Sequence, residues 1–310
     1  MCGIAGYLAR TDGDAPVGAV LLAMLGALGR RGPDSAGLAM FGRGDPDGEV
    51  CGVRLPDEVD PEISEAKLLD RIARVGHVIR HRRVDRFIRL VIERSSELPE
   101  FLAQIERRSD GFEVLSLGRR LELMKQVGSP TNLESAFGVA AFRGSHGIGH
   151  TRLSTESRVD LSHSQPFWAR GIADLATVHN GHITNYDRLR RIYEQQGYRF
   201  FTHNDSEVIA VYLADRLHQG ASLDQAVRDS LDDFDGSFTY LFATPDSFGY
   251  ARDPFALKPL IIVDTPAFVA VANEEVAIRA ALGAGGIAHE PSGHVYRIYD
   301  RPGTVADAAA

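Results

Sequence analysis

The chain begins Met1-Cys2-Gly3-Ile4-Ala5-Gly6, and these residues indicate both its architecture and its chemistry. Removal of Met1 would leave Cys2 carrying a thiol and an α-amine, whose ordinary pKa is about 8. Such an amine can take the thiol proton near neutral pH, directly or through one water. The apolar, glycine-spaced run that continues to Leu8 predicts a strand. We therefore expect a cysteine nucleophile at a terminus that is fixed in a sheet rather than frayed.

The bulk composition excludes several classes of protein. The chain has 310 residues, of which 44% are hydrophobic and 25% charged, as in ordinary globular proteins of one or two domains. The net charge of −8 disfavours nucleic-acid binding. The two cysteines, Cys2 and Cys51, exclude a disulfide framework and fit a reduced, cytoplasmic setting. Neither a signal peptide nor an apolar run of membrane-spanning length is present, so no membrane contact is expected.

The first third of the chain divides into a regular part and a distinct middle segment. We expect a buried helix over 16–29 with Asp14 as its cap, a turn over 30–37, a strand over 38–41 and a loop over 43–60. Residues 62–133 change in character and predict a small α/β insert. Its expected elements are a helix from 62 to about 80, a strand over 84–92, a helix over 96–107 capped by Ser96, a strand over 112–117 and a helix over 119–127.

The insert is rich in arginine. Its arginines are Arg71, Arg74, Arg80, Arg82, Arg83, Arg86, Arg89 and Arg94. This pattern favours either a docking face for an acidic partner or RNA, or simply a solvated surface of helix and strand. The sequence leaves both interpretations open.

The remaining residues read as a strand-rich α+β chain. Strands are expected at 137–142, 147–152, 173–178, 237–243, 248–251, 260–264, 267–271 and 294–299, and helices at 185–196, 205–218, 222–232 and 274–282. Residues 301–310 predict a loose C-terminal tail. Helices grouped in blocks beside many strands indicate layered sheets covered by helices.

Amide chemistry at Cys2 requires donors for the developing oxyanion. The tripeptide His179-Asn180-Gly181 follows an expected strand and offers a side-chain amide at Asn180 and an unobstructed backbone N–H at Gly181. Taken alone, Asn-Gly is also a common turn signal. Its role therefore depends on the groups that accompany it.

An amino-acid substrate requires a cation for its carboxylate and an anion for its α-ammonium. Arg152 can bind the carboxylate bidentately, and Thr155 can add a hydroxyl. Asp205 stands at the start of an expected helix and can receive the ammonium, although Asp205 or Asn204 can also serve as the helix cap. A charge for each end of the zwitterion favours a free amino acid as substrate.

Histidines support a competing hypothesis of a zinc hydrolase. Five of them fall within one stretch of the chain: His150, His163, His179, His182 and His203. No His-Glu-x-x-His pair occurs among them, so we expect structural histidines and no metal.

The motifs occur together in one order that resembles the glutaminase domain of class II glutamine amidotransferases. In sequence order they are Met1-Cys2-Gly3-Ile4, Arg31-Gly32-Pro33-Asp34-Ser35, Gly149-His150-Thr151-Arg152, His179-Asn180-Gly181, Asn204-Asp205-Ser206-Glu207, Asp235-Gly236-Ser237-Phe238 and Arg252-Asp253-Pro254. The resemblance covers residues 1–300 and is interrupted by 62–133. Each motif is weak by itself, whereas the ordered combination is specific.

The resemblance implies a four-layer α-β-β-α sandwich of the N-terminal-nucleophile hydrolase fold and hydrolysis of the glutamine side-chain amide. It implies that Cys2 is the nucleophile and that Asn180 with Gly181 forms the oxyanion hole. Arg152 and Thr155 would bind the substrate carboxylate and Asp205 its α-amine, while Arg31 would brace the site. Two departures concern the same loop: Leu153 stands where several members have Trp, and Glu156 where His is common.

The resemblance also implies a partner. No synthase domain accompanies the glutaminase motifs, so ammonia is expected to pass to a separate synthase subunit in a hetero-oligomer. The layout is similar to the amidotransferase subunit of N-methylglutamate synthase and related split glutamate-synthase-like systems. No cofactor is expected in this chain, and flavin or an iron–sulfur cluster would belong to the partner. The alternatives are a silent scaffolding subunit that docks through the arginine-rich insert, and an N-terminal-cysteine amidohydrolase of another amide.

Overall fold

The first strand lies where the sequence predicts it, at the centre of a sheet. The computed structural model describes residues 2–11, 13–107, 109–154 and 158–302. Strand β1 spans Gly3–Ala9 and every one of its residues is buried. It lies between two antiparallel neighbours, β8 (His146–Arg152) and β14 (Phe268–Ala272). The residue after Cys2, Gly3, is therefore paired with Thr151 of β8, and the ladder with β14 begins at Ala5.

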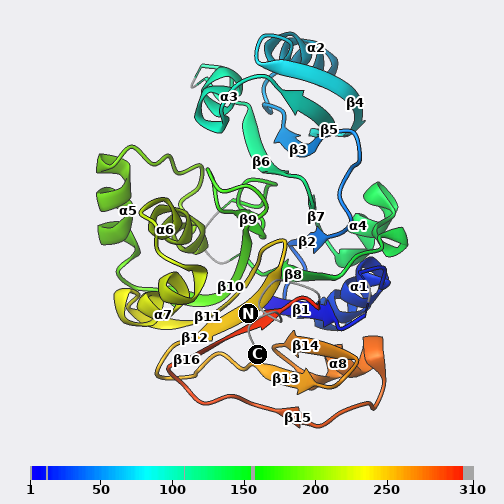
Figure 1. The fold of residues 1–310 in the computed structure, drawn as a ribbon, viewed down its shortest axis with the longest axis vertical. Coiled ribbons are helices and arrows are strands. Elements are labelled where there is room, and N and C mark those ends of the chain that lie inside the picture. Colours follow the sequence, from blue (N-terminus) through cyan, green and yellow to red (C-terminus); the bar gives the residue numbers. More distant parts are fainter. Residues whose placement is uncertain (1, 12, 108, 155–157, 303–310) are drawn as a thin grey trace.

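Two antiparallel sheets form the middle of the molecule (Figure 1). The seven-stranded sheet has the order β15-β13-β14-β1-β8-β2-β7, its further strands being β2 (Ser35–Phe41), β7 (Leu121–Val127), β13 (Ile261–Asp264) and β15 (Ala288–His289). The five-stranded sheet has the order β16-β12-β11-β10-β9. Its strands are β9 (Phe167–Trp168), β10 (Ala176–Ile183), β11 (Gly236–Ala243), β12 (Ser247–Arg252) and β16 (Val295–Asp300).

Helices cover the outer face of each sheet. On the seven-stranded sheet lie α1 (Val17–Leu28), α4 (Pro130–Phe137), the 3-10 turn η1 (Val139–Ala141) and α8 (Glu275–Leu282). On the five-stranded sheet lie α5 (Tyr186–Gln195), α6 (Ser206–His218) and α7 (Leu223–Asp233). Figure 1 shows these two groups on opposite sides of the paired sheets. The expected α+β class and four-layer order are thus confirmed.

The alternation of side chains along the strands explains the layers. In β1, Ile4 and Leu8 pack between the two sheets, whereas Ala5 and Tyr7 pack beneath α1 and α8. Residues two apart share a face of a strand, so both faces of this strand are apolar and buried. Gly6 faces inward, and a Cβ there would come within 2.5 Å of the Phe248 ring. Glycine at this position therefore allows the sheets to approach.

A third sheet forms a separate group of elements at the top of Figure 1. It has the order β4-β5-β3-β6, with β3 (Glu49–Arg54), β4 (Gly76–Val84), β5 (Phe87–Arg94) and β6 (Glu113–Gly118). Helices α2 (Pro61–Ile72) and α3 (Leu98–Ile105) belong to the same group. We call residues 49–118 the inserted unit. Its apolar side chains join the same contiguous core that fills the space between the two large sheets.

The structure corrects the expected boundaries 62–133 of this insert. Strand β3 lies within the expected loop 43–60 and pairs with both β5 and β6. Residues 119–127 contain strand β7 rather than a helix, and β7 pairs with β2 in the seven-stranded sheet. The helix expected from 62 to about 80 ends at Ile72, and β4 begins at Gly76.

Two expected helix caps are also wrong. Asp14 does not cap α1, whose N-cap is Pro16 with no side-chain bond; the Asp14 carboxylate instead lies 3.8 Å from the Arg143 guanidinium. Ser96 donates to the Val75 carbonyl (3.4 Å), and α3 begins at Leu98. The expected tail lies outside the described residues from 303 onward. Each helix in the described part of the chain is too short or too polar to cross a bilayer.

Candidate active site

A cavity of about 490 Å³ opens where β1 begins, and Cys2 lies in its wall. Its wall comes from several distant parts of the chain: Cys2, the end of β8, the loop before β9, the end of β10 with the turn and first residues of α5, and the start of α6. The lining residues are Cys2, Arg152, Leu153, Ser154, Gln165, His179, Gly181, His182, Ile183, Thr184, Tyr186, Asp187, His203, Asn204, Asp205 and Ser206. Groups from distant motifs therefore meet in one space.

The backbone around Cys2 is held on two sides. Arg31 donates from Nε to the Cys2 carbonyl (3.1 Å) and also forms an ion pair with Glu274. The Ile4 N–H donates to the Asn273 side-chain oxygen at 2.5 Å. Arg31 does not line the cavity, so its contacts place it behind the nucleophile, in the bracing position that the resemblance implies.

The thiol of Cys2 lies in an environment that favours its neutral form. Burial raises the pKa of the Cys2 thiol; the Arg152 guanidinium opposes this shift, and the Asp205 carboxylate adds to it. A raised pKa means that few thiolates form spontaneously at neutral pH. A base close to Sγ is therefore required for nucleophilic attack.

Asn180 and Gly181 lie at the end of β10, in register with β11. Asn180 is 4% exposed, and its Nδ2 has no hydrogen-bond partner within the described part of the chain. It shares a face of β10 with Val178, which packs between the sheets, so the amide lies on the inter-sheet side. Gly181 has φ of +141°, and a Cβ there would meet the Ser237 carbonyl at 2.2 Å. Gly181 lines the cavity, whereas Asn180 is buried beside it and is not among the lining residues.

Arg152 ends β8 with its guanidinium in the cavity wall. It is 3% exposed and donates to the Arg158 carbonyl (2.8 Å) and toward the Ser154 hydroxyl (3.4 Å). Asp34 fixes the same loop, because its carboxylate accepts the Ser154 N–H (2.7 Å). Thr155 and Glu156 lie outside the described residues.

Asp205 directs its carboxylate toward β10 and the cavity. Its Oδ2 accepts the Ile183 N–H (2.8 Å) and lies 3.5 Å from Nδ1 of His182. Asp205 occupies the N-cap position of α6 without a side-chain cap bond, whereas Asn204 Oδ1 accepts the Ser206 N–H (3.0 Å). The two residues thus divide the roles that the sequence left open: Asn204 binds the first turn, and Asp205 faces the cavity.

Two of the five histidines, His150 and His179, are buried and hydrogen-bonded within the fold, whereas His182 is exposed. His150 is fully buried, and burial lowers its pKa to about 3. Its Nε2 lies 3.2 Å from the His179 carbonyl, and Nδ1 of His179 contacts the Ser206 hydroxyl (2.8 Å). No three His, Cys, Asp or Glu side chains gather as a metal-binding group within residues 2–11, 13–107, 109–154 and 158–302. The zinc hypothesis therefore has no ligand set in this part of the chain.

Sequence reasoning missed two polar residues of the cavity wall, Gln165 and Ser206. Gln165 is 3% exposed; its Oε1 accepts the His179 N–H (2.6 Å) and its Nε2 donates to Ser206 Oγ (3.0 Å). Gln165 therefore joins the β10 segment to the start of α6. In the sequence, the position of Gln165 directly before Pro166 was the local signal for this residue.

The motif Arg252-Asp253-Pro254 holds β11, the strand that pairs with the Asn180-Gly181 end of β10. Asp253 is fully buried, and its Oδ2 accepts the Phe238 N–H (2.9 Å). Phe238 is the partner of Gly181 in the β10–β11 ladder. The motif therefore holds the strand that faces the expected oxyanion hole.

Known proteins are similar to this chain in sequence. A family model described as a glutamine amidotransferase domain matches residues 150–280. The chain is 35% identical to a putative glutamine amidotransferase of Methanothermobacter thermautotrophicus, over 97% of this chain and 100% of that protein. It is 36% identical to the glutamine amidotransferase-like protein GlxB of Rhizobium meliloti, over 88% of this chain and 89% of that protein.

Solved structures share the fold. The glutamine phosphoribosylpyrophosphate amidotransferase of B. subtilis, complexed with ADP and GMP, superposes with a TM-score of 0.62 at 20% identity. The match covers 96% of this chain and 47% of that enzyme, so the chain spans about half of its length. At this identity the likeness concerns the fold alone.

Two facing antiparallel sheets with helices on their outer faces are the fold of the N-terminal-nucleophile hydrolases. Within that class, the chain belongs to the class II glutamine amidotransferases, as its two nearly full-length relatives show. The family resemblance inferred from the motifs is thereby confirmed, and the chain is an enzyme of the glutamine-hydrolysing kind.

Proposed function

We propose that Cys2 attacks the side-chain amide of free glutamine and that the released ammonia passes to a separate synthase subunit. The observation that carries this proposal is the cavity itself. It brings Cys2 together with Arg152 and Asp205, one charge for each end of an amino acid. An unpartnered Asn180 amide lies on the strand beside it. The roles of Cys2, Asn180, Gly181, Arg152, Thr155, Asp205 and Arg31 are part of the proposal.

The reaction requires the α-amine of Cys2 and therefore removal of Met1. The amine takes the thiol proton, and Sγ attacks the amide carbon. Asn180 Nδ2 and the Gly181 N–H stabilise the oxyanion. The ammonium returns its proton to the departing nitrogen, and ammonia leaves a γ-glutamyl thioester. Water, deprotonated by the same amine, then releases glutamate and restores the thiol.

Charge matching supports free glutamine over another amide. Leaving one buried charge without its partner is unfavourable, so a substrate lacking the α-ammonium would leave Asp205 uncompensated. Substrates with a blocked α-amine, such as N-acetylglutamine, are therefore expected to react poorly. Efficient hydrolysis of N-acetylglutamine would favour the alternative of an amidohydrolase for other amides.

The acceptor is proposed to be a glutamate-synthase-like enzyme, with N-methylglutamate synthase as the specific candidate. Flavin or an iron–sulfur cluster would then reside in the partner. Affinity purification of the chain from its source cells, followed by absorption spectroscopy of any bound subunits, tests this part.

The glutaminase proposal is tested by intact mass before and after treatment with the glutamine analogue 6-diazo-5-oxo-norleucine. Loss of Met1 and a single adduct on Cys2, with ammonia release from glutamine, support the proposal. Retained Met1, no adduct and no ammonia, also with the partner subunits present, would instead support a silent scaffolding subunit. The contacts of the inserted unit weaken that alternative, because most of its arginines are paired with carboxylates of the same chain, either within the unit or next to it.

A further inference from the structure

The loop 158–165 lies between the inserted unit and the cavity wall. It folds back on itself: Asp160 accepts the His163 N–H and contacts its Nδ1, both at 2.8 Å, and the Asp160 carbonyl accepts the Ser164 hydroxyl (2.6 Å). Ser162 and Ser164 are both buried. The loop is therefore a compact element that transmits a displacement at one end to the other.

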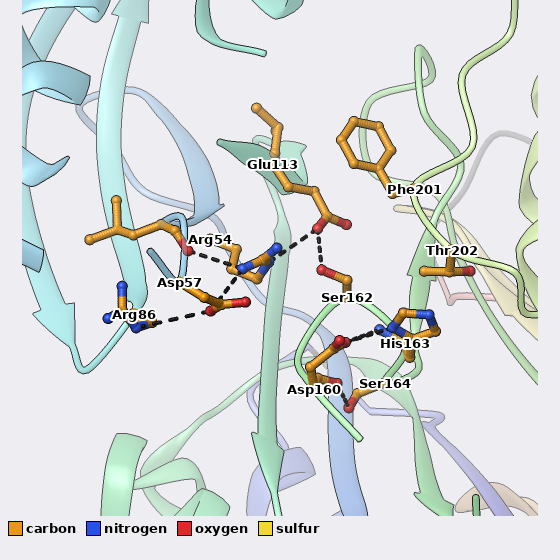
Figure 2. A network of polar contacts seen from close by, with 12 residues as sticks. Arg54, Asp57, Arg86, Glu113, Asp160, Ser162, His163, Ser164, Phe201 and Thr202 are labelled. Carbon is orange, nitrogen blue, oxygen red and sulfur yellow. Dashed lines mark hydrogen bonds and ion pairs between the residues drawn. The ribbon is translucent and has the colours of Figure 1, made fainter. Parts of the chain in front are cut away.

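One end of this loop is attached to the inserted unit. Ser162 donates its hydroxyl to the Glu113 carboxylate of β6, which is 6% exposed (Figure 2). The same Glu113 oxygen lies 3.4 Å from Arg54 Nε, and Arg54 also contacts Asp57 at 3.1 Å. Arg86 lies 4.0 Å from Asp57. In the series of contacts that runs from Arg86 through Asp57, Arg54 and Glu113 to Ser162, Ser162 is the member that belongs to the loop 158–165 (Figure 2).

The other end of the loop is attached to the glutamine site. Gln165 bonds both to the His179 backbone, next to the expected oxyanion hole, and to Ser206, next to Asp205. Asn204 Nδ2 adds a contact to the His163 carbonyl (3.4 Å). The loop therefore contacts both segments that would bind the reacting amide and the α-amine.

We propose that Glu113 of the inserted unit is a positioning residue for the glutamine site, acting through Ser162 and Gln165. This inference rests on the proposed glutaminase function and extends it. None of the described residues of the inserted unit, 49–107 and 109–118, lines the cavity. Its Glu113 fixes the loop whose far end sets the spacing between Gly181 and Asp205. Because a misplacement of about 1 Å can reduce an enzymatic rate on the order of 10²-fold, such an anchor is consequential.

The experiment compares Ser162→Ala, Ser162→Thr, Glu113→Ala and the double variant Ser162→Ala/Glu113→Ala. Three quantities are measured: KM and kcat for glutamine, the rate of Cys2 modification by 6-diazo-5-oxo-norleucine, and its rate with iodoacetamide. The first reagent requires the amino-acid site, whereas iodoacetamide reports only on the thiol. Glu49→Gln is the control, because it breaks the Glu49–Arg94 ion pair of the same unit away from the loop.

We expect Ser162→Ala and Glu113→Ala each to raise KM and to slow modification by the glutamine analogue about 10-fold. Iodoacetamide rates should be unchanged, and Ser162→Thr should restore both losses by retaining a hydroxyl. The double variant should lose no more than the worse single variant, because both residues act through one contact. Glu49→Gln should match the unmodified protein.

Unchanged KM and analogue rates in folded Ser162→Ala and Glu113→Ala would overturn the inference. So would additive losses, or an equal slowing of both reagents. A failure of the proposed function looks different, because the unmodified protein itself would then release no ammonia and form no analogue adduct.

Discussion

Arginines in the inserted unit and Arg152 in the cavity wall have different partners. In the inserted unit they face carboxylates: Arg71 pairs with Asp110, Arg74 with Asp70, Arg80 with Asp45 and Asp47, Arg83 with Glu65, Arg89 with Glu122 and Arg94 with Glu49. Arg82 donates to the Ala136 carbonyl (3.4 Å). In the cavity, Arg152 donates to a backbone carbonyl and approaches a hydroxyl.

The place of each arginine in the molecule separates the two groups. Arg152 lies in the wall of the cavity with Cys2 and Asp205, so its guanidinium can act on whatever enters the cavity, whereas the carboxylate-paired arginines of the inserted unit lie away from that wall. The number of arginines in a segment therefore says little about docking. The partners of each arginine decide between the two interpretations that the sequence left open, and they favour a solvated, internally paired surface for the inserted unit.

The nucleophile provides the strongest test of the cavity as the reactive region. Cys2→Ala should reduce glutaminase activity to the background rate, since no other thiol or hydroxyl in the proposal replaces Sγ. Ammonia release from glutamine measures this loss, and an unchanged melting temperature shows that the fold persists. Turnover at the normal rate in this variant would refute the mechanism.

The oxyanion donor ranks next. Asn180→Ala should lower kcat by about 10²–10³-fold, or about 2.7–4 kcal/mol of transition-state stabilisation, as for oxyanion-hole donors elsewhere. Steady-state kinetics with glutamine measures the change. A higher KM with normal kcat would instead assign Asn180 to ground-state binding.

The comparison of arginines is tested by making one substitution in both regions. Arg152→Met should reduce kcat/KM for glutamine by about 10²-fold, because the substrate carboxylate loses a buried cationic partner. Arg94→Met should leave kcat/KM unchanged although it lowers stability, since Arg94 pairs with Glu49 away from the cavity and both side chains are mostly buried. Equal effects on kcat/KM would remove the distinction between the two regions.

The loop between the two regions should show a pH-dependent stability. Burial would raise the pKa of Asp160, but the hydrogen bonds from His163 outweigh it and lower the pKa to about 2, against an ordinary value of 3.8. A depressed carboxyl pKa stabilises the fold above the unfolded value and loses that effect as pH falls toward 2. Asp160→Asn should therefore reduce the free energy of unfolding by about 2 kcal/mol at pH 6.

Urea unfolding of the unmodified protein and of Asp160→Asn at pH 6, 4 and 3 measures this effect. The difference between their free energies of unfolding should become smaller at each lower pH. Asp70→Asn is the control, because Asp70 belongs to an exposed i,i+4 pair with Arg74 and should change stability within about 0.5 kcal/mol at any pH. A gap that stays constant with pH would refute the assignment.

Local patterns predicted much of the catalytic sandwich. The helices expected at 205–218 and 222–232 are observed at 206–218 and 223–233, because their apolar spacing and flanking residues agree with their packing. The site motifs were equally accessible, since each functional group lies within a short segment. Cys2, Arg152, Gly181 and Asp205 all line one cavity, as the motifs predict.

The C-terminal boundary of the inserted unit was less predictable, because the local signals in the strand that follows the unit conflict. Residues 121–127 consist largely of good helix formers, yet burial alternates from Leu121 to Gln126 and the segment forms a strand beside β2. Tertiary pairing overrides helix propensity here. The link from Glu113 through Ser162 to Gln165 joins positions that no local pattern relates, so only the folded chain shows it.

The shared core of the inserted unit bears on how the molecule unfolds. Ile88 and Phe101 of the unit belong to one apolar cluster with Ile4 and Val178 of the sandwich. Elements that share a core lose their packing together, so heating should give one cooperative transition rather than two. Joining Phe41 directly to Leu121 would remove the inserted unit and expose the apolar side chains that pack against it. We expect the shortened chain to aggregate rather than to yield a smaller enzyme.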